Sequence, residues 1–435
     1  MNIDQYVGCR ALSCYGKIPS PSIRGLIIAV YTMSVFLVTA SIAQAQISSY
    51  TYVAAENATV NFSTPVDVAF GANSSFAYKY GMAGNITFSD AIFGDPDYGV
   101  LKSGYYKAFT HCAGELGSYT FTIPVEAAYG ANGLYFYKLG VSGTVNFTPA
   151  FFGGDPDYGV VKAGYYMPYT QCAGEGGSYT FATSTNVAYG ANGKYYFLYG
   201  VTGTIVFTPS TFGGDPDYGV VKAGYFRPAS GFGAIVSRAQ FNQMFPNANS
   251  FYSYSALVNA CTAYPGFCTS GNATQNAQEA AAFLANVAHE TGGLVYINEI
   301  AQAPYCSGSA TPCGVCASGQ EYYGRGPMQI SWNYNYCACG QAIGQNLWGN
   351  PNLVSTNATI SWQTGLWYWM TQTGATSTTS HQAILNGDFD GTIRAINGGV
   401  ECNGGDPAEV QDRLDYYLEF LQDLGVGAGS TATGC

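Results

Sequence analysis

Hydrophobic and polar positions follow two different patterns in the two halves of the chain. Between residues 46 and 232, Thr, Val, Phe and Tyr alternate with polar residues in short runs such as residues 143–148, GTVNFT. Alternation with a period of two is typical of half-buried β-strands, and no segment of this half has convincing helical periodicity. We therefore predict an all-β N-terminal part.

The same half contains an internal repeat with a period of about 60 residues. The sequence Gly-Asp-Pro-Asp-Tyr-Gly-Val occurs three times, beginning at Gly94, Gly154 and Gly214. Each copy is preceded by Gly-Ala-Asn and followed by Lys-x-Gly-Tyr-Tyr or Lys-x-Gly-Tyr-Phe. Repeated strands separated by Gly, Asn and Asp-Pro turns predict three β-modules in tandem.

After a Gly- and Pro-containing break at residues 228–234, the pattern changes to that of helices. Small apolar residues at spacings of three and four predict a helix over residues 278–289, which Gly292 ends. His289 and Glu290 then lie at the C-terminal end of this helix.

Two further helix starts follow from capping residues. Ser237 is the expected N-cap of a helix that extends to Phe245, and Asp406 followed by Pro407 begins the last helix. Arg413 lies beside the apolar stripe of that last helix. The second half, residues 233–435, is thus expected to be mainly α-helical.

Composition limits the classes of partner. The 435 residues suggest two or three domains, and 47% hydrophobic residues suffice for a sizeable core. A net charge of -11 argues against nucleic acid or an anionic membrane as partner. With 37 tyrosines and few charges, the surface suits a neutral, hydroxyl-rich ligand, although a β-rich secreted protein without such a ligand has the same composition.

The N-terminus and the cysteines indicate export. Residues 25–40 carry no charge, and Ala43-Gln44-Ala45 is a small-x-small cleavage site, so residues 1–45 are expected to form a signal peptide. An uncleaved signal anchor is the alternative. Thirteen cysteines fit an oxidising compartment. We expect a secreted protein, extracellular or associated with a cell wall.

Two glutamates carry the candidate chemistry. In a chain with only 9% charged residues, Glu290 and Glu299 lie nine positions apart. Glycoside hydrolysis needs one carboxylic acid to protonate the leaving oxygen and a second carboxylate to activate water or attack the anomeric carbon. Taken alone, two glutamates at this spacing are more often unrelated surface charges. A zinc motif is excluded, because Gly293 stands where its second histidine belongs.

Four motifs strengthen this interpretation. They occur in order at residues 289–293 (HETGG), 322–336 (YYGRGPMQISWNYNY), 366–370 (LWYWM) and 395–402 (AINGGVEC). Together they resemble the motifs of glycoside hydrolase family 19, the inverting chitinases best known from plants. The resemblance covers residues 233–435 and implies a mainly α, lysozyme-like, two-lobed catalytic domain. The segment between the two acids is short, as in loop-deleted members of the family.

The resemblance also implies roles for individual residues. Glu290 is the general acid, Glu299 the general base, and Ser331 helps to hold the attacking water. The residues that support the acid are His289, Glu401 and Arg413. The residues that line the sugar cleft are Gln329, Tyr334, Asn335, Ile396 and Asn397.

Disulfides are expected in this domain. The resemblance implies the pairs Cys306–Cys313 and Cys402–Cys435, and Cys261 is expected to pair with Cys268.

The function implied is that of an endochitinase that cleaves β-1,4 bonds between N-acetylglucosamine units with inversion. It needs no cofactor and no metal, its partner is chitin or a related polymer, and we expect a monomer. Two alternatives remain open: a peptidoglycan hydrolase on the same scaffold, and a non-catalytic chitin- or cell-wall-binding protein.

The modules at residues 46–232 have two interpretations. They form a carbohydrate-binding array in which Tyr98, Tyr158 and Tyr218, or the set of Tyr105, Tyr165 and Tyr225, offer ring faces to sugars. Alternatively, these tyrosines pack inside the modules, which then act as a spacer.

Overall fold

The computed structural model describes residues 47, 49–308, 311–429 and 435. The expected signal peptide at residues 1–45 lies outside this range. In the described part of the chain, no helix is both long enough and apolar enough to cross a membrane.

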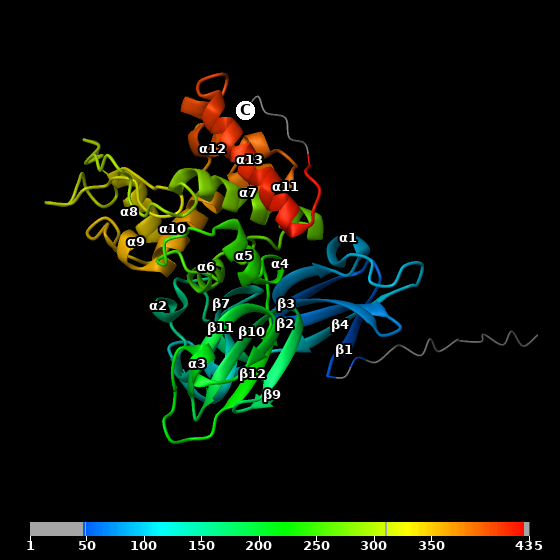
Figure 1. The fold of residues 1–435 in the computed structure, drawn as a ribbon. Helices are drawn as coiled ribbons and strands as arrows, with labels where there is room; N and C mark the ends of the chain where they lie inside the picture. The colour runs from blue at the N-terminus through cyan, green and yellow to red at the C-terminus, as the bar shows by residue number, and fades with distance from the viewer. Residues whose placement is uncertain (1–46, 48, 309–310, 430–434) are drawn as a thin grey trace, which may run out of the picture. The chain divides into compact units, whose positions relative to one another are not determined.

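Each predicted module forms one antiparallel four-stranded sheet, and the three sheets share one strand order, first-fourth-second-third. In Figure 1 the strands lie in the part of the chain coloured blue to green, and the longer helices follow in the part coloured green to red. A short helix connects the third strand to the fourth in each module. The elements are β1 (Thr51–Ala55), β2 (Thr59–Ala72), β3 (Ser75–Thr87), α1 (Asp90–Phe93) and β4 (Ser103–Ala108); β5 (Thr110–Gly114), β6 (Ser118–Ala131), β7 (Leu134–Asn146), α2 (Pro149–Phe152) and β8 (Ala163–Pro168); β9 (Thr170–Gly174), β10 (Ser178–Ala191), β11 (Lys194–Val206), α3 (Pro209–Phe212) and β12 (Ala223–Pro228). The all-β prediction is confirmed.

The repeated glycines and asparagines have identifiable structural roles. Asn132 and Gly133 turn the β6–β7 hairpin with φ values of 51° and 84°, the left-handed pair that a tight hairpin requires. In the Lys-x-Gly-Tyr sequence, the ring of Phe147 packs on Gly164 so closely that a Cβ there would lie 2.3 Å from a ring carbon. The repeat is therefore a packing unit in which a phenylalanine covers bare backbone.

A buried ionic cluster joins the three modules. The Arg227 guanidinium on β12 donates to Asp67 on β2, at 2.8 and 2.9 Å, and to Glu126 on β6. All three side chains are at most 5% exposed. Burial raises the pKa of the Glu126 carboxyl, although the Arg227 charge opposes this shift. One arginine of the third module thus compensates carboxylates of the first and second.

The C-terminal half is helical, as predicted. Its elements are α4 (Phe232–Ile235), α5 (Arg238–Met244), α6 (Tyr254–Cys261), α7 (Ala273–Thr291), α8 (Asn333–Ala342), α9 (Leu353–Thr356), α10 (Ala358–Thr371), α11 (Ser380–Leu385), α12 (Phe389–Glu401) and α13 (Pro407–Leu424). Helix α7 is almost entirely buried in its middle turns and packs in one core cluster with α10 and α13. It is the helix around which this half is built.

The helix starts agree with the capping residues. Ser237 caps α5 in a reciprocal capping box with Gln240. Asp406 caps α13 with Pro407 at the first turn, and its side chain accepts from the Glu409 N–H. Helix α7 begins five residues earlier than predicted, because Asn272 forms a capping box with Gln275.

The expected pair Cys306–Cys313 is wrong. Cys306 pairs with Cys316, and Cys313 pairs with Cys337 of α8. The reason is a tight turn at residues 311–314, closed by hydrogen bonds of 3.0 and 2.9 Å between Thr311 and Gly314. Cys313 lies inside this turn and bonds to Cys337, whereas Cys316 follows the turn and bonds to Cys306.

The expected pair Cys261–Cys268 is also wrong, because both thiols are free. The backbone N–H of Cys268 donates to the buried Glu279 carboxylate at 2.9 Å, which fixes this residue independently of any disulfide. The pair Cys402–Cys435 is present, as the resemblance implies.

Candidate active site

The end of α7 presents the candidate acid. Gly292 ends the helix in the left-handed conformation, with φ 59°, so His289 and Glu290 occupy its last turn. A glycine adopts this conformation without the steric penalty of a side chain, which is why Gly-Gly after the helix is an effective stop. The local sequence thereby places one acid at the boundary between the helical core and the surface.

Helix α13 supplies the charge that holds this acid. The Arg413 side chain is 1% exposed, and its Nη2 donates to Glu290 at 2.5 Å and to Glu401 at 2.7 Å. Its Nε donates to the second oxygen of Glu401 at 2.8 Å, and Nη1 donates to Asn286 of α7 at 3.1 Å. Helices α7, α12 and α13 therefore meet at one guanidinium.

Glu401 is the fully buried partner in this cluster, at 2% exposure. Burial alone would raise its pKa, but the hydrogen bonds and charge of Arg413, the Asn397 amide and His289 together hold the pKa below its ordinary value. Asn397 donates to Glu401 at 2.8 Å from a non-helical position, φ −141°, that kinks α12. Glu401 thus stays ionised and balances Arg413.

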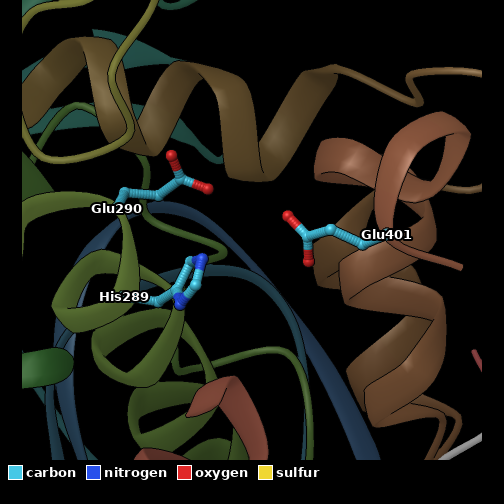
Figure 2. A group of neighbouring side chains, drawn as sticks. All are labelled: His289, Glu290 and Glu401. Atoms are coloured by element: carbon cyan, nitrogen blue, oxygen red, sulfur yellow. The ribbon is translucent and has the colours of Figure 1, made fainter. Parts of the chain in front are cut away.

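His289 links α7 to α13 next to the acid. Its Nδ1 lies 2.7 Å from the Asp412 carboxylate and its Nε2 lies 2.9 Å from Glu409. A ring that carries protons on both nitrogens satisfies both contacts. Figure 2 shows Glu290 and Glu401 pointing toward one another from their helices, with the His289 ring beside them.

These three side chains could be taken for a metal site. One ligand atom each from His289, Glu290 and Glu401 lies within 4.8 Å of the others. However, Arg413 already donates to both glutamates, and each ring nitrogen of His289 faces a carboxylate of α13. The positive charge that a cation would bring is supplied by the protein, so the donor set fits an ion network rather than a metal.

The candidate base lies in a second cluster. The Glu299 N–H donates to the Gly324 carbonyl at 2.9 Å, and its Oε1 accepts from the Ala303 N–H at 3.0 Å. A Cβ on Gly324 would lie 3.0 Å from both Glu299 Oε2 and Gln329 Oε1. Because Gly324 has no side chain, the Glu299 and Gln329 side chains can both approach its backbone.

Tyr305 is a partner of Glu299 that the sequence did not reveal. Partial burial raises the pKa of the Tyr305 hydroxyl, and the Glu299 charge and a hydrogen bond to that carboxylate raise it further. The Tyr305 ring meets Trp332 edge-on at 5.2 Å, and Trp332 stacks with Tyr334 at 6.0 Å. A line of rings thus extends from the base to Tyr334, which is 46% exposed.

The other expected cleft residues have mixed environments. Gln329, with φ 45°, donates to the Gly326 and Ile297 carbonyls at 2.8 and 3.3 Å. The Asn335 amide donates to the Ser331 carbonyl at 2.9 Å. The Tyr368 hydroxyl of α10 donates to the Ile396 carbonyl at 3.3 Å. The charge of Glu290 also contributes to the raised pKa of Tyr368, after burial.

The candidate site therefore consists of two carboxylates, each held by its own partners. The acid cluster holds Glu290, Glu401, Arg413, His289 and Asn397, and the base cluster holds Glu299 and Gln329. Sequence reasoning missed Tyr305, Tyr368, Glu409 and Asp412. Of these, only Glu409 and Asp412, which both contact His289, carried a signal, because side chains three positions apart lie on the same surface of a helix.

Two carboxylates, each with its own partners, are what glycoside hydrolysis requires. The family model described as chitinase class I, glycoside hydrolase family 19, matches residues 235–434. Endochitinase A of Zea mays is 44% identical over 206 residues, which cover 46% of this chain and 70% of that protein. The chain belongs to glycoside hydrolase family 19.

Two other relatives have similar sequence identity and coverage. An endochitinase of Phaseolus vulgaris is 39% identical over 231 residues, covering 45% of this chain and 70% of that protein. The solved structure of chitinase C from Streptomyces griseus is 51% identical and covers 48% of this chain and 99% of that chain, with a TM-score of 0.45. The family match begins at residue 235 and leaves the three modules outside it.

The depressed pKa of Glu401 makes a prediction about stability and pH. A carboxyl whose pKa is lower in the folded state stabilises the protein above its unfolded pKa, about 4.3, and loses this contribution as the pH falls. Replacing one partner of a buried ion pair costs about 3–5 kcal/mol. Glu401→Gln should therefore lower the melting temperature strongly at pH 7 and progressively less below pH ~4.3.

The measurement is a series of thermal melts from pH 3 to pH 8. Glu419→Gln, an exposed change on the neighbouring helix α13, is the control for loss of one negative charge. A difference between wild type and Glu401→Gln that stays constant over the whole pH range would contradict the ionised role of Glu401.

Proposed function

We propose that this chain is a secreted endochitinase that hydrolyses β-1,4 bonds between N-acetylglucosamine units with inversion of the anomeric carbon. The observation that supports it most is the acid cluster, in which a buried arginine holds Glu290 by one carboxylate oxygen. The names of the relatives, endochitinases of maize and bean, support chitin as the polymer.

In the proposed mechanism Glu290 donates its proton to the glycosidic oxygen as that bond breaks. Glu299, oriented by Ala303 N–H and Tyr305, accepts a proton from the water that attacks the opposite face of the sugar. Ser331 helps to hold that water. Inversion requires carboxyls about 6.5–9.5 Å apart, so that one water fits between base and sugar. The reaction as proposed needs no cofactor and no metal.

Several side chains would bind the polymer. We assign Gln329, Tyr334, Asn335, Ile396 and Asn397 to the sugar-binding surface. The exposed Tyr334 ring, backed by Trp332, offers a flat apolar face to a pyranose. Asn397 is shared, since its amide also donates to Glu401. A sugar that binds Asn397 would therefore alter the hydrogen bond between Asn397 and Glu401 in the acid cluster.

Export is part of the proposal. Three disulfides in the described part of the chain favour an oxidising compartment. Sequencing the N-terminus of the exported protein tests it: a mature chain that begins at Gln46 agrees, and a retained leader would favour the anchored form.

The catalytic proposal is tested by the stereochemistry of the product. Chitin hexamer is incubated with the enzyme in a proton NMR tube, and the anomeric signals are followed before mutarotation. The α-anomer should appear first, because water attacks the face opposite the leaving group. Initial formation of the β-anomer would contradict Glu299 as a base. Turnover of bacterial cell walls without turnover of chitin hexamer would favour the peptidoglycan hydrolase, and no turnover of either would favour a binding protein.

A further inference from the structure

The two tyrosine sets of the modules have opposite environments. Tyr105 is 3% exposed and meets Phe76 edge-on at 5.7 Å, and Tyr225 meets Tyr195 in the same way at 5.6 Å. These rings pack inside their own modules. In contrast, Tyr98, Tyr158 and Tyr218 are 93%, 94% and 93% exposed. This second set is the one that projects almost completely into solvent.

Each exposed tyrosine stands at the corner of a tight turn. In the first module the Val100 N–H donates to the Asp97 carbonyl at 3.2 Å, and Gly99 has φ 78°. This geometry is that of a turn with glycine at its third position, which leaves the second position at the outermost point. The second and third modules repeat the turn at Gly159 and Gly219, with φ 81° and 78°.

A lysine and an asparagine of the same module fix each turn. The buried Lys102 pairs with Asp95 at 2.9 Å, and the Asn73 amide donates to Asp97 at 3.0 Å. The same two contacts recur in the other modules, at 2.8 and 3.0 Å in the second and 2.8 and 3.1 Å in the third. Because the turn is already ordered, a ligand that contacts the ring loses little conformational entropy from the protein.

The same contacts engage the acidic groups of each turn. Both aspartates of each Asp-Pro-Asp are engaged by a lysine or an asparagine of their own module, so they serve the turn rather than a bound cation. What remains at the tip is an uncharged Tyr-Gly-Val with a further exposed aliphatic residue, Leu101, Val161 or Val221. Such a tip suits an uncharged surface.

A single exposed ring needs no special explanation. Here the same ring occupies the same corner of three separate turns, where it makes almost no contribution to the packing of its module. A phenol ring presents a flat apolar face edged by one hydroxyl, which matches the axial C–H face of a neutral pyranose and its hydroxyl rim. The net charge of -11 disfavours an anionic polymer as the occupant.

We propose that Tyr98, Tyr158 and Tyr218 bind insoluble chitin and hold the catalytic domain at its substrate. This proposal rests on the proposed function only for the identity of the polymer. Three weak contacts on one chain act together on a polymer with many equivalent sites, and linked sites of this kind strengthen binding by about 10²–10⁴-fold.

The test uses the full chain with Glu290→Gln, so that the polymer is not digested during binding. Tyr98→Ala, Tyr158→Ala and Tyr218→Ala are combined in one variant, and binding isotherms on chitin particles are compared. We expect the triple variant to bind about 10²-fold more weakly. The corresponding triple change to Phe should retain most of the affinity, because the ring face is kept. Leu116→Ala, an exposed apolar residue elsewhere in the second module, is the control.

Activity on soluble chitin hexamer separates this proposal from the proposed function. In the background with Glu290 intact, the triple Ala variant should hydrolyse the hexamer at the wild-type rate and particulate chitin more slowly. Unchanged binding of the triple Ala variant to particles would overturn the proposal, whatever the activity. If the wild-type protein does not hydrolyse the hexamer, the catalytic assignment is wrong. The binding isotherms would then still decide whether the three tyrosines bind chitin.

Discussion

The buried guanidinium of Arg413 is the constraint on which the catalytic half depends. A charge at 1% exposure is tolerated only if opposite charges and hydrogen-bond acceptors surround it. Glu401, Glu290 and Asn286 meet that requirement from two other helices. Arg413 therefore couples the packing of α7, α12 and α13 to the position of the acid. The proposed catalytic acid is the more exposed of the two carboxylates, Glu290, which is 18% exposed.

A similar principle organises the modules. Asp67 of the first module and Glu126 of the second compensate the charge of Arg227 in the third. The burial of this one charge therefore requires the three modules to pack together. The buried lysine of each turn is compensated in the same way within its own module. Lys102, at 3% exposure, is paired with Asp95 and Asp90. In both halves, buried charges fix geometry, whereas hydrophobic packing supplies most of the stability.

Much of this could be predicted from sequence, because local rules determine it. Asn132 with Gly133 specifies a hairpin turn, Gly292 stops α7 beside Glu290, and Asp406 with Pro407 begins α13. What could not be predicted depends on how loops return through space. Cys306 pairs with Cys316 because of the turn at residues 311–314, which the sequence does not predict. Tyr305 contacts Glu299 within an irregular segment, where no periodicity indicates the contact. The tyrosine sets could be separated only by burial, since both have the same spacing.

The central claim is that Glu290 donates the proton. The most direct measurement is the hydrolysis rate of chitin hexamer by Glu290→Gln, compared with wild type and with Glu419→Gln as an exposed control of the same chemical change. A general acid contributes about 10²–10⁴-fold, so Glu290→Gln should lose a factor of that size while its melting transition stays cooperative. The control should keep the wild-type rate. A folded Glu290→Gln protein that hydrolyses the hexamer as fast as wild type would contradict the account.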